Sequence, residues 1–122
     1  MSAIFHITSA EEARDAARAG IYAPSAFEAE GFIHCSYAHQ VCEVADRIFS
    51  GRSDLVLLEI DRTKLTCEII DETLEGGGQL FPHIYGRLPA GAVVRIHSFP
   101  CGEDGRFELP ETVTKPSTAG AA

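Results

Sequence analysis

The chain has 122 residues, of which 45% are hydrophobic and 23% are charged, as in an ordinary globular domain with its own core. The formal net charge of -8 argues against a general nucleic-acid-binding surface, which needs a cationic patch. The first residues lack the basic-then-apolar pattern of a signal peptide, and no apolar run approaches the length of a membrane span, so we expect a cytoplasmic protein without a membrane segment.

The N-terminal stretch predicts a strand followed by a capped helix. Residues 3–7 are expected to form a short strand. Ser9 and Glu12 make a capping box for an alanine-rich helix over residues 10–19, and Gly20 ends that helix.

A second strand and helix are predicted next. Residues 31–34 are expected to be extended, and Ser36 is expected to cap a helix that Gly51 stops. The helix is indicated by an apolar stripe at helical spacing, which consists of Tyr37, Val41, Val44, Ala45, Ile48 and Phe49.

The second half of the chain is predicted to consist mainly of β-strands. Residues 55–60 are almost continuously apolar, which predicts a central strand covered on both faces. Further strands are expected at residues 67–70, 81–85 and 93–99, and the three glycines at 76–78 predict a turn.

The composition sets the expected domain boundary. We expect residues 1–110 to form a single domain. Residues 111–122 are rich in Thr, Ala, Ser and Pro and are expected to be a disordered tail.

The four cysteines have spacings that match no zinc ribbon or redox pair, so we expect reduced thiols and no tightly bound metal or cofactor. One alternative is a metal site in the local cluster of His34, Cys35, His39 and Cys42. Another is a nucleophilic Cys35, activated by His34 and by the N-terminus of the predicted helix.

Three histidines stand in apolar surroundings, where imidazole nitrogens need partners. These are His6, His34 and His83, and we predict that they surround one cleft. Tyr85 shares a strand face with His83. The alternative for each histidine is a structural hydrogen-bond network. His39 and His97 are expected to be surface residues.

Two phrases carry a family resemblance. Residues 31–36 read Gly-Phe-Ile-His-Cys-Ser, and residues 81–86 read Phe-Pro-His-Ile-Tyr-Gly. With their surroundings over about residues 4–110, they resemble the bacterial domain of unknown function 952 family. The chain is also distantly similar to the ADP-ribosyltransferase superfamily, especially its RNA 2'-phosphotransferase branch, at residues 6–8, 33–36 and 58–61.

The distant resemblance implies an α+β fold of the ADP-ribosyltransferase type. In such a fold, two small twisted sheets frame a cleft and two main helices pack outside it. It also implies a nucleotide-like small-molecule ligand, with NAD as a possible substrate. Ligand contacts would fall to His6, Thr8 and Ser36, and catalytic roles to His34, His83 and Tyr85.

One departure leaves several functions open. Many superfamily transferases carry a catalytic glutamate in the last motif, but residues 81–86 contain no acid, and Glu75 lies outside that motif. From the resemblance we expect an NAD- or ADP-ribose-using transferase or hydrolase, whereas the missing glutamate favours binding without catalysis. The alternatives are a nucleotide or modified-ribose binding module without catalysis, and a hydrolase of another small molecule. We expect a monomer or weak dimer.

Overall fold

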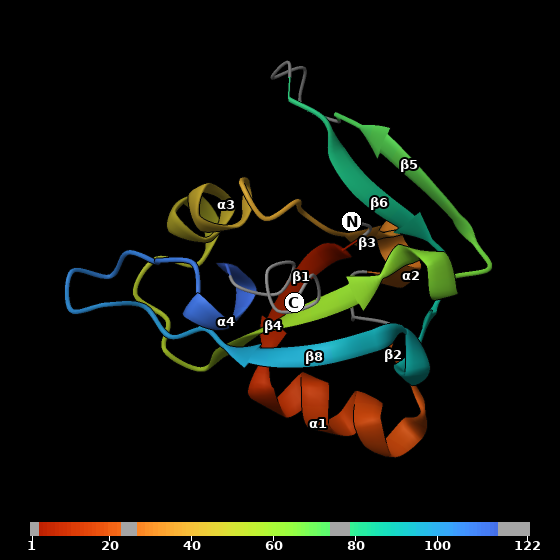
Figure 1. Cartoon of the computed structure of the whole chain (residues 1–122), viewed down its shortest axis with the longest axis horizontal. Helices are drawn as coiled ribbons and strands as arrows, with labels where there is room; N and C mark the ends of the chain where they lie inside the picture. The colour runs from red at the N-terminus through yellow and green to blue at the C-terminus, as the bar shows by residue number, and fades with distance from the viewer. Residues whose placement is uncertain (1–2, 23–26, 74–78, 115–122) are drawn as a thin grey trace, which may run out of the picture.

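The computed structural model describes residues 3–22, 27–73 and 79–114. These residues form an α+β fold with three antiparallel sheets, in the strand orders β1-β4-β8, β2-β7 and β3-β6-β5 (Figure 1). The coarse α+β prediction is confirmed. The described part differs from the expected pair of sheets by the additional two-stranded sheet of β2 and β7.

The first sheet consists of β1 (Ala3–Ser9), β4 (Leu55–Asp61) and β8 (Val93–Ser98), with β4 in the centre. Alternate β4 side chains enter two separate core clusters. Leu58 packs in the cluster that contains Ala13 of the first helix, and Leu57 packs in the cluster that contains Val41 of the third. The prediction of a central strand covered on both faces is therefore confirmed.

Helix α1 (Ala10–Ala19) has the predicted caps at Ser9 and Gly20, but the predicted capping box is only half formed. The Ser9 hydroxyl accepts a hydrogen bond from the Glu12 backbone N–H at 3.1 Å, and Gly20 ends the helix in the left-handed conformation with a φ of 81°. The Glu12 carboxylate does not return to Ser9, because it accepts a hydrogen bond from the Thr8 hydroxyl at 3.0 Å.

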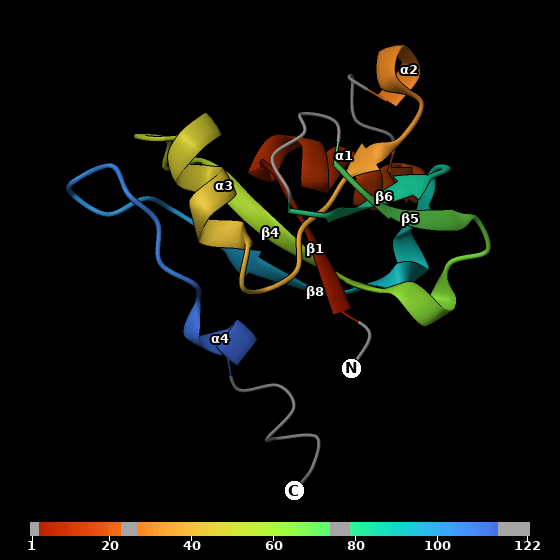
Figure 2. The same cartoon turned by 90° about the horizontal axis from the view of Figure 1, so that it is seen from above.

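Helix α3 (Val41–Ile48) begins later than predicted, and Ser36 is not its cap. Ser36 forms an isolated antiparallel bridge with Phe5 and gives both of its backbone groups to that strand. Gln40 occupies the N-cap position, and its buried side chain accepts from the Tyr37 N–H at 2.9 Å. The short helix α2 (Phe27–Glu30) precedes this region and projects from the rest of the fold (Figure 2).

The third sheet consists of β3 (Ile33–His34), β6 (Phe81–Tyr85) and β5 (Glu68–Glu72). Its register places His34 opposite His83. The remaining elements are the strands β2 (Ile21–Tyr22) and β7 (Leu88–Pro89) and the 3-10 turns η1 (Arg62–Lys64) and η2 (Ala90–Ala92). The predicted glycine turn at 76–78 lies outside the described residues.

Two expectations near the C-terminus are corrected. Helix α4 (Glu111–Thr114) follows the predicted domain end, and its Val113 is buried in the core. His97 is buried rather than exposed. Both ring nitrogens have partners in the core, since Nε2–H donates to the Glu59 carboxylate at 2.7 Å and Nδ1 contacts the Thr112 hydroxyl at 2.5 Å. Residues 115–122 lie outside the described part.

No helix in the described part of the chain is long and apolar enough to cross a membrane.

The two core clusters generate a stability prediction. Ile60 on β4 is 0% exposed, and Ile96 on the neighbouring β8 is 50% exposed. We expect Ile60→Val to lower the free energy of unfolding by about 0.5–1.5 kcal/mol, because a buried methyl group is lost. The matched change Ile96→Val should cost less than about 0.5 kcal/mol in urea denaturation. Equal costs would contradict the placement of Ile60.

Candidate functional site

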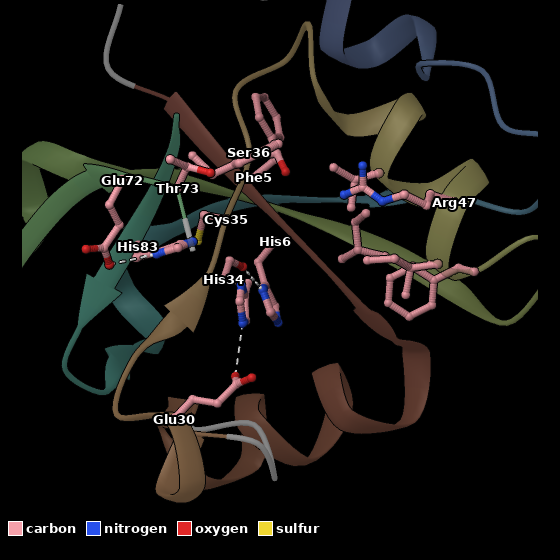
Figure 3. A pocket seen from close by; sticks show the side chains of 15 residues that line it. Phe5, His6, Glu30, His34, Cys35, Ser36, Arg47, Glu72, Thr73 and His83 are labelled. Atoms are coloured by element: carbon pink, nitrogen blue, oxygen red, sulfur yellow. Dashed lines mark hydrogen bonds and ion pairs between the residues drawn. The ribbon is translucent and has the colours of Figure 1, made fainter. Parts of the chain in front are cut away.

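A cleft of about 350 Å³ lies between the first and third sheets and is bordered by α3. The structure brings His6 of β1, His34 of β3 and His83 of β6 to this one cleft (Figure 3). Cys35 and Ser36 also line it. Thr8 and Tyr85 are not among the lining residues.

Aromatic packing orients two of the histidines. The rings of His34 and His83 lie 5.0 Å apart at an angle of 77°. Phe32 stacks on His83 at 4.4 Å and meets the edge of His34 at 4.8 Å. These offset and edge-on contacts, together with the β3–β6 register, hold the two imidazoles in a defined relation.

Glu72 supplies a carboxylate to the cleft that the sequence reading missed. It lies on β5 and accepts hydrogen bonds from Nδ1–H of His83 at 2.8 Å and from the Tyr85 hydroxyl. The hydrogen bond from Tyr85, followed by that from His83, lowers the pKa of Glu72. The same bond raises the pKa of Tyr85. Glu72 is therefore an ionised carboxylate at neutral pH, fixed by two donors.

A second imidazole–carboxylate pair stands at the solvent side of the cleft. Nε2–H of His34 donates to the Glu30 carboxylate at 3.0 Å, and their side chains are 51% and 41% exposed. An exposed pair of this kind contributes little to stability. His34 is therefore open to a ligand, whereas the His83 side chain is almost fully buried.

His6 has both ring nitrogens engaged by the protein. Its Nδ1–H donates to the His34 carbonyl at 2.5 Å, and its Nε2 lies 2.8 Å from the Tyr22 hydroxyl. The Tyr22 hydroxyl continues to Thr8 at 3.0 Å, and Thr8 donates to Glu12. Burial lowers the pKa of His6 to about 4. His6 and Thr8 thus have partners within the protein, and their ligand-binding roles stay predictions.

The structure argues against the alternative of a nucleophilic Cys35. Cys35 is buried, and burial raises the pKa of its thiol far above the ordinary range, so the reactive thiolate is disfavoured. Ser36 lines the cleft but does not cap a helix, so no helix N-terminus opens there. Among the described residues, no group of three or more His, Cys, Asp and Glu side chains has an arrangement that could hold a metal ion.

Two further charged side chains in the cleft were not predicted. Glu30 belongs to the unpredicted helix α2, and Arg47 extends from α3 (Figure 3). Glu72 was missed because the predicted strand ended at residue 70, two positions short of it. The segment reads Glu-Ile-Ile-Asp-Glu, so no apolar–polar alternation in the sequence marks residues 71 and 72 as part of the strand.

The network around His6 generates a pH prediction. Because folding lowers the pKa of His6 to about 4 from the ordinary 6.5, the unfolded chain binds the extra proton between these values. The stability from this group is complete above about pH 6.5 and is lost as the pH falls toward 4. His6→Gln should therefore flatten the pH dependence of unfolding in this window. An NMR titration of His6 with a midpoint near 6.5 would contradict the prediction.

The chain is similar to the members of one protein family. The family model described as "Protein of unknown function (DUF952)" matches residues 7–96. The crystal structure of protein CC0527 from Caulobacter crescentus is 31% identical, with a TM-score of 0.82 over 92% of this chain and 98% of that one. Its solution NMR structure is 33% identical, with a TM-score of 0.78 over 89% and 94%. No curated protein matches. The chain belongs to the DUF952 family, as its phrases predicted.

Proposed function

We propose that the cleft binds NAD or a related ADP-ribosyl compound and that the protein is a transferase or hydrolase of its N-glycosidic bond. The observation that carries this proposal is the Glu72 carboxylate, which lines the cleft and is held by His83 and Tyr85. The sequence resemblance to the ADP-ribosyltransferase superfamily at three phrases supports the proposal. A volume of about 350 Å³ lies in the range of small-molecule sites.

Glu72 has the properties that this chemistry needs. Breaking the bond between ribose and nicotinamide develops positive charge on the ribose, and a fixed carboxylate stabilises that charge as it forms. The hydrogen bonds from Tyr85 and His83 favour the ionised form of Glu72. The acid absent from residues 81–86 is thus supplied by the neighbouring strand β5.

The histidines divide into two roles. His34 is half-exposed in the cleft and is suited to exchange a proton with the attacking water or acceptor. His83 lies behind it and holds Glu72. Tyr85 also acts through Glu72, so we assign it as a positioning residue rather than a catalytic one.

The first test removes the charge of Glu72. Glu72→Gln should lower kcat for nicotinamide release from NAD by about 10²- to 10³-fold, because the developing ribosyl charge loses its stabilising partner. ADP-ribose affinity, measured by calorimetry, should change much less. Glu68→Gln, on the same strand but exposed and outside the cleft lining, is the matched control.

The wild-type protein decides between the candidate functions. Binding of NAD and ADP-ribose without release of nicotinamide would favour the non-catalytic binding module. If thermal shift and calorimetry detect neither compound, the proposal is abandoned.

The second test concerns Tyr85. Activity should be retained above the pKa of Glu72 and lost as the pH falls through that pKa. The pKa itself lies below the usual glutamate value. Tyr85→Phe removes the main hydrogen bond that lowers this pKa, so the acidic limb of the pH–rate profile should move to higher pH. A purely structural role for Tyr85 would change stability and leave that limb in place.

A further inference from the structure

The two carboxylates of the cleft have imidazole partners, whereas its arginine has no ion-pair partner among the described residues. Glu30 and Glu72 each have an imidazole partner, at 3.0 Å and 2.8 Å. Arg47 is the one lysine or arginine among the described residues that line the cleft. It is exposed, and no carboxylate of the described chain lies within ion-pair distance of it. With respect to the described residues, therefore, an unpaired guanidinium lines a cleft in a protein of net charge -8.

The surroundings of Arg47 are apolar. Val44 and Ile48 of the same helix, and Phe49 at its C-terminal end, also line the cleft, and Ile48 is 60% exposed. Figure 3 shows Arg47 reaching from α3 toward the segment of Ser36, on the side away from Glu72 and Glu30. The cleft thus has a cationic, apolar end and a carboxylate–imidazole end.

This arrangement selects the position of an anionic group. A phosphate near Glu30 and Glu72 would meet two carboxylates, whereas the planar guanidinium of Arg47 offers paired donors that match phosphate geometry. The positive charge that develops on the ribose would then lie at the carboxylate end. A substrate with a phosphate on one side and a reacting ribosyl carbon on the other fits both ends.

We propose that Arg47 is a specificity-determining residue that binds the phosphate of the substrate, so that the protein acts on ribosyl nucleotides rather than on ribonucleosides. This inference rests on the proposed function and adds the residue and the chemical group that set its selectivity.

The test compares nicotinamide mononucleotide with nicotinamide riboside, which differ by one phosphate. Calorimetry of the wild-type protein should give an affinity about tenfold to a hundredfold higher for the mononucleotide, with the difference shrinking as salt is added. Arg47→Gln should remove most of that preference, and Arg47→Lys should keep part of it, because the charge remains while the fork is lost. The same variants are measured with NAD.

Arg14→Gln is the matched control. Arg14 is exposed on α1, outside the cleft lining, and its loss makes the same change in net charge. A loss of mononucleotide and NAD affinity in Arg47→Gln but not in Arg14→Gln supports the inference. Equal affinities of the two compounds for the wild type, or equal losses in the two variants, would overturn the role of Arg47 alone. If NAD and ADP-ribose also fail to bind, the proposed function fails together with it.

Discussion

The cleft depends on one short bridge between two strands that are distant in sequence. Phe5 and Ser36 exchange two backbone hydrogen bonds of 2.8 Å each, which joins the edge of the first sheet to the segment leaving β3. Because His6 follows Phe5, the bridge brings its ring beside His34, whose carbonyl it binds. The same bridge uses the N–H and carbonyl of Ser36, and α3 begins only after Gln40.

Three imidazole–carboxylate pairs of the described structure differ in burial, and the most buried pair lies in the core whereas the other two line the cleft. The Glu59–His97 pair is almost wholly buried and ties β4, β8 and α4 together, so loss of one partner would leave an uncompensated polar group in the core. The Glu72–His83 pair has a buried imidazole and a partly exposed carboxylate. The Glu30–His34 pair is open to solvent. The second and third pairs belong to the cleft, and their increasing exposure gives it a fixed carboxylate and an accessible histidine.

Local signals were sufficient for part of the fold and misleading elsewhere. Helix α1 was predictable because the Ser9 cap and the Gly20 stop act within one turn of the helix, and β4 because a nearly continuous apolar run is typical of a strand covered on both faces. Ser36 resembles a helix cap, but its partner Phe5 is 31 positions away along the chain, and tertiary pairing overrides local preference. His97 was misassigned for the same reason, since its partner Glu59 lies on another strand. The cleft histidines were recognisable in the sequence because an imidazole in an apolar segment needs hydrogen-bond partners. Glu72 and Arg47, in contrast, look like ordinary surface charges until the sheets are assembled.

The neutrality of His6 determines the charge pattern that a ligand meets. Burial keeps its ring uncharged near neutral pH, and Tyr22 behind it leads to Thr8 and α1 rather than to solvent in the cleft. His6 therefore adds no positive charge between the two ends. Among the described lining residues, the charged groups other than the histidines are the carboxylates of Glu30 and Glu72 and the guanidinium of Arg47. Under the proposed function, a charged His6 would offset Glu72 and weaken the stabilisation of a developing cation, so a neutral His6 favours the mechanism proposed above.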